Sequence, residues 1–217
     1  MLADDVYPLQ IPEAIGIKAF RNICDGCYMA GLENCIIISF QGSKTMESWA
    51  RNLKFWKVPL PYNPVRRIHA GFYQSWQALK AHIVAWAPII VDSQKPVYSI
   101  GHSAGGVLAI LFWRYLKKYC EFLNVKFVTF GCPDFGNKAM VDNIESLKND
   151  RNSITQVVNG YDLVPSLLDN KLGYEKLLTP ILLLKQPWWH RFFRRKRDHD
   201  LEEYYKSSLI QFSKYQI

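Results

Sequence analysis

The chain has 217 residues, 49% of them hydrophobic and 21% charged, a globular composition that excludes wholesale disorder, collagen and coiled coil. This length fits one domain, which we expect to span residues 1–217. The 27 basic and 19 acidic residues give a net charge of +8, which favours an anionic partner.

The amino-terminal region shows no export or membrane signal. Its first ten residues hold two acids and no basic leader, and no apolar run reaches the roughly 18 to 20 residues that span a membrane. We therefore expect a cytoplasmic protein, peripheral at membranes, with no transmembrane segment. Cys24, Cys27 and Cys35 cluster, but a zinc site needs a second ligand pair and none follows closely, so we expect reduced thiols and no metal.

Strands and helices are expected to alternate along the rest of the chain. Apolar runs predict strands at 35–40, 97–100, 126–130 and 154–158. Helical spacing predicts helices at 45–53, 71–90, 104–119, 138–149 and 201–212, and residues 59–64 form a proline-rich loop. The alternation after residue 97 is typical of parallel βαβ units, so we predict an α/β fold with a mostly parallel central sheet flanked by helices.

The strongest chemical motif is a serine between glycines. The pattern Gly-x-Ser-x-Gly is filled by Gly101-His102-Ser103-Ala104-Gly105, directly after a predicted strand and before a predicted helix. A sharp turn there exposes the serine hydroxyl at the carboxyl edge of the sheet, and the Ala104 amide faces a developing oxyanion. A phosphate-binding turn is the alternative, but such a loop uses a lysine near the helix start, and none lies between Gly101 and Phe112.

A serine nucleophile needs a histidine as general base. In α/β-hydrolases the acid and then the histidine follow the serine along the chain, and the histidines after Ser103 are His190 and His199. We favour His199, because it directly precedes a predicted helix in a loop that can fold back over the sheet edge. His190 lies beside two tryptophans in a basic segment, where a surface or membrane-facing position is expected.

The base in turn needs a carboxylate to orient it. Asp162 follows the predicted strand 154–158 through the turn Asn159-Gly160-Tyr161, which places it at the same sheet edge as the serine. Asp134 also follows a predicted strand and is the second choice. The candidate triad is therefore Ser103, Asp162 and His199.

Several blocks of sequence, in the right order, resemble the class 3, fungal-type lipases of the α/β-hydrolase superfamily. The blocks are Phe40-Gln41-Gly42-Ser43, residues 49–53, His69-Ala70-Gly71-Phe72, the serine motif, Phe130-Gly131-Cys132-Pro133, Asp162-Leu163-Val164-Pro165 and Asp198-His199. The resemblance implies a compact variant of the α/β-hydrolase fold, the same triad, and an oxyanion hole built from Ser43 and the Ala104 amide. It also implies a lipid ester substrate and no organic cofactor.

The resemblance further implies a lid, a short helix after the oxyanion residue that covers the site. Here its apolar face would consist of Met46, Trp49 and Leu53, which suits contact with a lipid surface. A small core helix is the alternative. Two departures from the family pattern, Gln41 in place of an arginine and Asp134 in place of a basic residue, predict different ion pairs around the serine turn.

A basic, aromatic segment precedes His199. Tryptophan favours the membrane interface, and each basic residue near an anionic surface contributes about 1 kcal/mol. We therefore predict docking on anionic phospholipid rather than on nucleic acid; a protein contact or a solvated loop whose aromatics pack on the core are the alternatives. The docking residues are Trp188, Trp189, Arg191, Arg194, Arg195, Lys196 and Arg197.

Together these motifs predict a serine hydrolase that cleaves carboxylic esters of lipids through an acyl-enzyme, as a lipase or phospholipase does. Two other functions stay open. One is a soluble esterase or thioesterase that acts on small substrates with a fixed lid. The other is a catalytically idle hydrolase fold that binds anionic membranes through residues 185–197.

Overall fold

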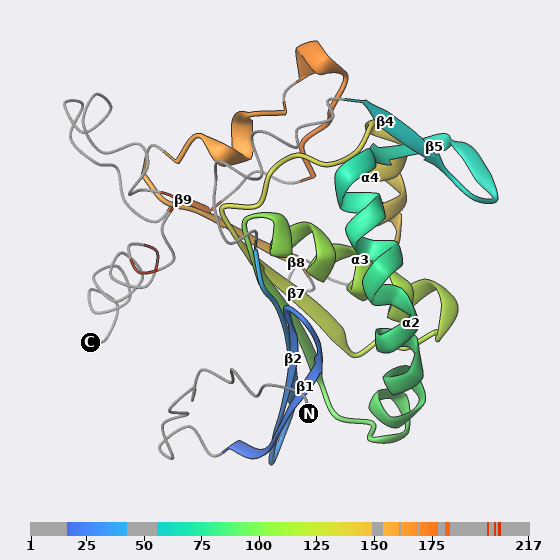
Figure 1. Cartoon of the computed structure of the whole chain (residues 1–217), viewed down its shortest axis with the longest axis vertical. Helices are drawn as coiled ribbons and strands as arrows, with labels where there is room; N and C mark the ends of the chain where they lie inside the picture. Colours follow the sequence, from blue (N-terminus) through green and yellow to red (C-terminus); the bar gives the residue numbers. More distant parts are fainter. Residues whose placement is uncertain are drawn as a thin grey trace, which may run out of the picture.

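The computed structural model describes residues 17–42, 56–148, 154–160, 162–168, 170–177, 181–182, 199, 202 and 204. Within them, seven strands form one sheet in the order β1-β2-β3-β6-β7-β8-β9 (Figure 1). Neighbours from β3 to β9 run parallel, and β2 is antiparallel to both β1 and β3. The mostly parallel sheet that the sequence predicted is thus confirmed. The strands are β1 (Ile17–Cys24), β2 (Cys27–Leu32), β3 (Ile36–Phe40), β6 (Val97–His102), β7 (Val125–Phe130), β8 (Ile154–Val158) and β9 (Ile181–Leu182).

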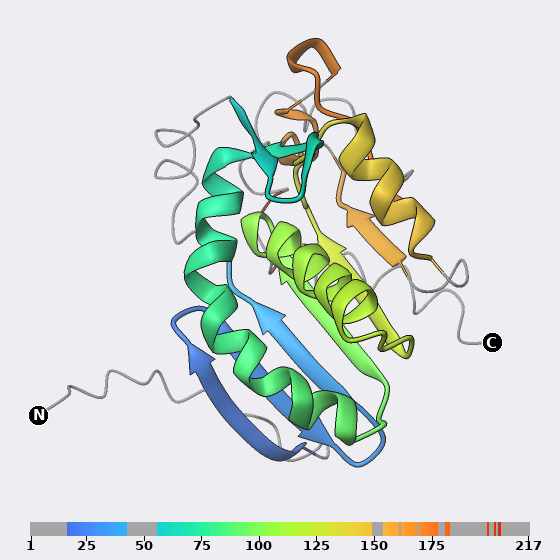
Figure 2. The same cartoon turned by 90° about the vertical axis from the view of Figure 1, so that its right-hand side faces the viewer.

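Three described helices cover one face of this sheet: α2 (Ala70–Asp92), α3 (Ala104–Tyr119) and α4 (Lys138–Ser146), as Figure 2 shows. Helix α3 occupies the centre because its sequence is apolar on nearly every side, and most of its residues are buried. Helix α4 begins at Asn137, whose side chain caps it by accepting a hydrogen bond from the amide of Met140. Two short 3₁₀ turns, η3 (Val164–Ser166) and η4 (Asn170–Leu172), follow β8.

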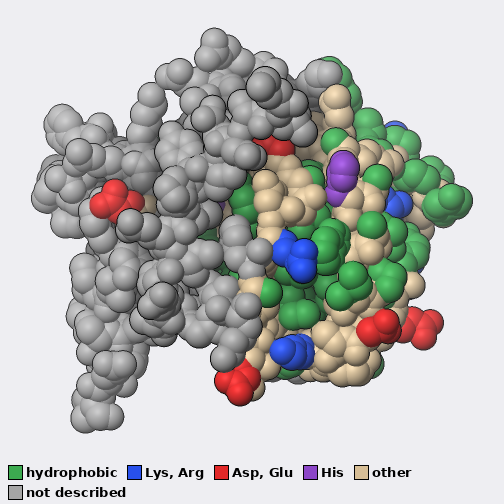
Figure 3. Space-filling view, turned by 60° about the horizontal axis from the view of Figure 1, so that its bottom comes forward, with side chains coloured by type: hydrophobic (Ala, Val, Ile, Leu, Met, Phe, Trp, Pro, Cys, Tyr) green, Lys and Arg blue, Asp and Glu red, His purple; other side chains and the backbone are tan. Residues whose placement is uncertain are grey.

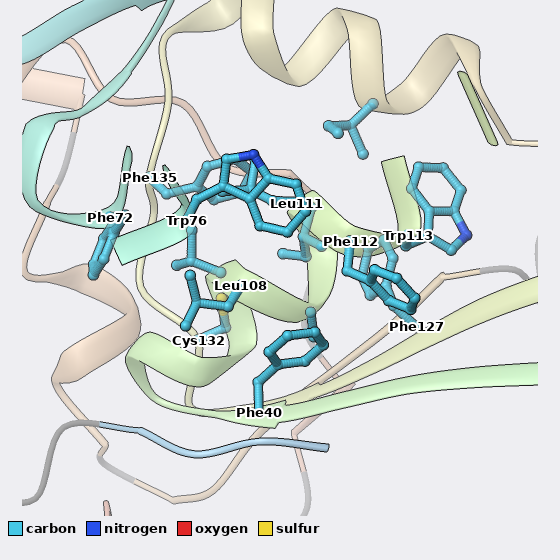
Figure 4. Packing of buried hydrophobic residues seen from close by; sticks show 14 of the residues in the cluster. Phe40, Phe72, Trp76, Leu108, Leu111, Phe112, Trp113, Phe127, Cys132 and Phe135 are labelled. Atoms are coloured by element: carbon cyan, nitrogen blue, oxygen red, sulfur yellow. The ribbon is translucent and has the colours of Figure 1, made fainter. Parts of the chain in front are cut away.

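Aromatic side chains pack α3 onto the sheet (Figure 4). Phe112 lies against Phe40 of β3 with ring centroids 5.7 Å apart, and Trp113 meets Phe127 of β7 edge-on at 5.3 Å. The indole nitrogen of Trp113 donates a hydrogen bond to the carbonyl of Val125 at 3.0 Å. Aromatic pairs of this kind contribute roughly 0.5–1.5 kcal/mol beyond their buried area, so they help to hold α3 against the sheet.

A β-hairpin replaces the proline-rich loop that we predicted at 59–64. Strands β4 (Lys57–Leu60) and β5 (Asn63–His69) pair as a separate two-stranded sheet. Pro59 and Pro64 both lie in these strands. A two-stranded sheet leaves one side of each strand without a partner, so a proline there need not remove a ladder hydrogen bond.

A second hairpin lies at the amino-terminal edge of the large sheet, where the sequence had predicted no strand. β1 and β2 join through a two-residue turn at Asp25-Gly26, and Gly26 adopts the positive φ of +76° that such turns need. The turn places Cys24 opposite Cys27 as the last pair of the hairpin, and both are free thiols. Burial raises the pKa of both thiols, which leaves them weak nucleophiles.

In the described part of the chain, the helices are too short or too polar to cross a membrane. Figure 3 shows one face of the molecule, on which hydrophobic side chains are spread widely and charged side chains are scattered between them. Such a mixture is ordinary for a folded protein, because apolar atoms make up more than half of most protein surfaces.

Candidate active site

Ser103 occupies a strained turn between β6 and α3. Its φ and ψ angles are 54° and −129°, a region that non-glycine residues enter at a cost of about 1–3 kcal/mol. The two flanking glycines make the turn possible: a Cβ on Gly101 would lie 2.1 Å from the Gly105 carbonyl, and one on Gly105 would lie 2.2 Å from the Phe40 carbonyl. The backbone amide of Ser103 donates to the carbonyl of Phe130 at 2.9 Å, which fixes the serine beside the end of β7.

His199 and Asp162 form a buried pair. Nδ1 of His199 lies 2.9 Å from Oδ2 of Asp162, the imidazole is 6% exposed, and the carboxylate is fully buried. A carboxylate oxygen only accepts hydrogen bonds, so Nδ1 carries the proton and the other ring nitrogen is left as the base. That nitrogen, Nε2, is buried and has no hydrogen-bond partner among the described residues. The pair is therefore arranged to take up a proton at Nε2.

Three donors orient the carboxylate of Asp162. Besides His199, the hydroxyl of Tyr204 donates to Oδ2 at 2.6 Å, and the amide of Val164 donates to Oδ1 at 2.9 Å. The amide of Asp162 itself donates to the carbonyl of Asn159 at 2.9 Å, which closes the turn after β8. Charge-assisted hydrogen bonds of this kind hold a buried carboxylate in one orientation.

Gly131 lies between Ser103 and the pair formed by His199 and Asp162. It follows Phe130, whose carbonyl binds the Ser103 amide, and its own φ is +56°. A Cβ at this position would lie 2.6 Å from Oδ2 of Asp162 and 3.0 Å from Nδ1 of His199, so only glycine fits. Through these contacts the structure brings Ser103, Asp162 and His199 to the carboxyl edge of β6, β7 and β8, whereas Asp134 does not take the acid's position.

Two contributors were not singled out from the sequence. His102 was noted only as the variable residue before the serine, yet its ring lies 4.6 Å from that of His199. Tyr204 lies within the helix predicted at 201–212, where nothing marked it as a partner of Asp162. The one signal that could have found it is the pair of tyrosines, Tyr204 and Tyr205, shortly after the block Asp198-His199.

The oxyanion side of the site is described in part. Helix α3 begins at Ala104, and its N-cap residue Ser103 makes no side-chain capping bond within the described residues, as expected where the first amides face a reacting group. Gly42 packs against the same turn, because a Cβ there would lie 3.3 Å from Cβ of Ser103. The remaining predicted site residues lie outside the described residues: Ser43, Met46, Trp49, Leu53, Trp188, Trp189, Arg191, Arg194, Arg195, Lys196 and Arg197.

Another buried histidine, His69, has a structural place at the start of α2. Its Nδ1 accepts the amide hydrogen of Phe72 at 3.4 Å and so caps the helix. Burial, with a smaller effect of the positive Lys57, lowers the pKa of His69 to about 4, so the ring is neutral near pH 7. In the part of the chain that the structure describes, no three His, Cys, Asp or Glu side chains are grouped to hold a metal ion.

Comparison with known proteins adds a family to this geometry. Residues 37–171 match the family described as Lipase (class 3). The chain is 32% identical over 152 residues to a lipase of Rhizomucor miehei, covering 65% of this chain and 40% of that protein. It is 27% identical over 142 residues to the secreted mono- and diacylglycerol lipase 1 of Fusarium solani, covering 64% and 41%. The chain thus spans about 40% of the length of these curated relatives.

A solved lipase confirms the α/β-hydrolase fold. It is described as a triacylglycerol lipase whose catalytic centre is a serine protease triad, and it superposes with a TM-score of 0.59 at 27% identity. The match covers 68% of this chain and 57% of that one.

The predicted cytoplasmic location is wrong. The Fusarium solani relative is a secreted lipase, which points to an extracellular rather than a cytoplasmic protein. The prediction rested on the composition of the first ten residues, a region that lies before the family match.

Proposed function

Because the chain belongs to the class 3 lipase family, we propose that it hydrolyses carboxylic esters of lipids through an acyl-enzyme on Ser103. One observation carries the proposal: the buried contact of 2.9 Å between His199 and Asp162, beside a serine in a strained turn. The relatives named as lipases support a lipid ester as substrate. The whole site is built from side chains and backbone amides.

In the acylation step, Oγ of Ser103 attacks the ester carbonyl carbon while Nε2 of His199 takes the hydroxyl proton. The tetrahedral oxyanion accepts hydrogen bonds from the Ala104 amide and from Ser43. When the intermediate collapses, the carbon–oxygen bond to the alcohol breaks, and the imidazolium returns its proton to the leaving alkoxide. Asp162 orients the ring throughout and stabilises its positive charge.

In the deacylation step, water takes the place of the departed alcohol. Nε2 of His199 removes a proton from this water, and the resulting hydroxide attacks the acyl carbon. The second tetrahedral intermediate collapses with cleavage of the bond to Oγ, and the proton passes to Ser103. The products are a carboxylic acid and the regenerated serine, so one water is consumed for each ester bond.

The predicted lid and basic segment complete the proposal. Met46, Trp49 and Leu53 form a lid over the site, and the segment from Trp188 to Arg197 docks the site on anionic phospholipid. The concentration of positive charge near the site favours phospholipids over neutral glycerides as substrates. An extracellular location, as the secreted relative indicates, is compatible with both features.

The test compares hydrolysis of p-nitrophenyl butyrate, phospholipid vesicles and a triacylglycerol emulsion. Ser103→Ala should lower the rate on every substrate by about 10⁴-fold or more. Ser75→Ala is the matched control, because this serine lies exposed on α2 and, among the described residues, its hydroxyl bonds to the helix carbonyl of Gly71 alone.

The substrates separate the proposed function from its rivals. Faster hydrolysis of vesicles than of emulsion supports the phospholipase assignment, and the reverse assigns neutral glycerides. Hydrolysis of the soluble ester alone would replace the lipase by a small-substrate esterase. A wild-type protein that binds anionic vesicles and is as inert as Ser103→Ala would overturn the catalytic proposal.

A further inference from the structure

A groove lies between the β4–β5 hairpin and helices α2 and α3, away from the candidate triad. Its volume is about 260 Å³, and Trp76 and Leu111 form its buried floor. Its lining from α3 runs from Leu111 to Tyr119, whereas Ser103 directly precedes the first residue of that helix. Arg114 lies eleven residues beyond Ser103, about 16 Å along the helix axis, so the two sites are separate.

Four basic side chains line this groove: Arg66 of β5, Lys80 of α2, and Arg114 and Lys118 of α3. None of the described residues that line it is acidic. The ion pairs recorded within the described residues involve none of the four. The groove therefore concentrates positive charge that no described carboxylate balances.

Arg114 is the most unusual of the four because it is only 8% exposed. Its Nε donates to Oδ1 of Asn143 at 2.8 Å, and its guanidinium lies 6.0 Å from the centroid of the Tyr119 ring. Both neighbours are uncharged. Burial lowers the pKa of Arg114, the hydroxyl of Tyr119 partly opposes this effect, and the nearby positive charge of Arg66 lowers the pKa a little further. A cation so deeply buried is normally balanced by an anion.

Aromatic residues with polar tips complete the walls. Tyr73 accepts a hydrogen bond from Nε2 of Gln77 at 2.7 Å, which leaves its phenolic hydrogen available to donate to an anion. Tyr62 stands fully exposed at the turn of the hairpin with a φ of 65°, where glycine or asparagine is preferred. An exposed aromatic residue kept in a strained turn at the rim of a groove indicates a binding role.

We propose that this groove binds a phosphate group carried on a compound with an apolar or aromatic body. The planar forks of Arg66 and Arg114 match phosphate oxygens in pairs, and Lys80 and Lys118 add charge at the rim. The apolar floor and the tyrosines contact the rest of the compound. Free phosphate and a phosphorylated lipid share this chemistry. The site does not depend on the proposed hydrolase activity, because none of its residues belongs to the triad.

Calorimetric titration of the 217-residue chain tests the proposal with inorganic phosphate, n-hexyl phosphate and n-hexanol, none of which is a carboxylic ester. We expect n-hexyl phosphate to bind, and to bind more weakly as salt is raised from about 50 to about 200 mM. Arg114→Gln should weaken binding roughly 10- to 100-fold, and Arg66→Gln and Lys118→Gln each roughly 2- to 5-fold. Arg67→Gln is the matched control, because Arg67 is exposed, adjoins Arg66 in β5 and does not line the groove.

The affinities of the probes and of the variants decide whether the proposal holds. Tighter binding of n-hexyl phosphate than of phosphate supports a phosphorylated compound with an apolar body, such as a phosphorylated lipid. Equal binding of the two would overturn the apolar part of the proposal and leave free phosphate as the ligand. If neither phosphate probe gives heat of binding at millimolar concentration, or if Arg67→Gln weakens binding as much as Arg66→Gln, the proposal is wrong. Arg66→Gln and Lys118→Gln decide the question even if Arg114→Gln does not fold, because the side chains of Arg66 and Lys118 are not buried.

Discussion

The imidazole rings of His102 and His199 lie against each other, with centroids 4.6 Å apart and planes inclined by 33°. Nε2 of His102 also lies 2.7 Å from the backbone carbonyl oxygen of His199. Because a carbonyl oxygen can only accept, Nε2 of His102 carries a proton and donates it to this bond. His102, the residue before the candidate nucleophile, thus fixes the backbone of the candidate base His199 through this hydrogen bond.

This contact predicts a positioning role for His102. His102→Ala should lower kcat on a soluble ester by about 10-fold with little change in KM, since one hydrogen bond to the base is lost. His102→Gln should recover part of kcat, because a glutamine amide can donate along the same direction. The exposed His82, changed to alanine, is the control. A kcat for His102→Ala equal to that of the wild type would exclude the positioning role.

Tyr204 predicts a change in both stability and rate. Its hydroxyl and Nδ1 of His199 share the same oxygen of Asp162, so Tyr204→Phe removes one of the carboxylate's donors without changing the packing of the ring. We expect the free energy of unfolding to fall by about 1–3 kcal/mol, and kcat to fall less than in Ser103→Ala. Urea unfolding and ester hydrolysis measure the two effects. The control is Tyr98→Phe, on β6, which should change neither the free energy of unfolding nor kcat by more than the error of the measurement.

Alanine variants of Gly131 and Gly173 distinguish the effect of backbone strain from that of a steric clash at the site. Gly131→Ala introduces a Cβ that would lie 2.6 Å from the Asp162 carboxylate, so the acid must move and activity should fall at least about 100-fold. Gly173 has a similar φ of +71°, but its Cβ would approach only the flexible end of Lys57 at 3.3 Å. Like Gly131→Ala, Gly173→Ala should therefore lower the free energy of unfolding by about 1 kcal/mol, but its activity should stay intact. Equal activities in the two variants would contradict the proposed role of the acid.

His69 predicts a dependence of stability on pH. Its pKa is about 4 in the folded protein and near 6.5 in the unfolded chain, so between these values the unfolded chain binds a proton that the folded protein does not. The free energy of unfolding should therefore decrease as pH falls through this window, with a loss of roughly 3 kcal/mol when complete.

Replacing His69 by asparagine, which can also cap α2, should flatten this dependence. Urea unfolding at about pH 7 and about pH 4.5 measures it, and the exposed His82→Asn is the control that should keep the wild-type slope. An unchanged slope in His69→Asn would show that other groups cause the acid sensitivity.

The central elements were predictable because their sequences are strongly patterned. The run of small and apolar residues at 104–119 forms helix α3 with the predicted bounds, and the strand at 154–158 also has its predicted bounds. Ser103 directly precedes α3 and Asp162 follows β8, so the positions of the candidate nucleophile and the candidate acid followed from the pattern. The single domain over residues 1–217 stays a prediction.

Other parts depend on contacts that no local pattern encodes. Proline is rare inside strands, so Pro59 and Pro64 led us to predict a loop. The structure has a hairpin there, because a two-stranded sheet tolerates proline in its strands. The strands β1 and β2 lack a clear apolar alternation, because most of the described residues in β2 are only half-buried. His102 and Tyr204 join the site through partners far along the chain, which a motif search cannot reveal.

The strand register described above also bears on when the chemistry can begin. His102 pairs with Phe130, and Phe130 with Val157, so the turns that carry Ser103 and Asp162 are aligned only when three strands have docked. His199 then bonds to Asp162, 37 residues before it, and its carbonyl oxygen to His102, 97 residues before it. Contacts so distant in sequence are slow to form, because a long loop has to be closed first. The proposed ester cleavage would therefore begin only once β6, β7 and β8 have docked.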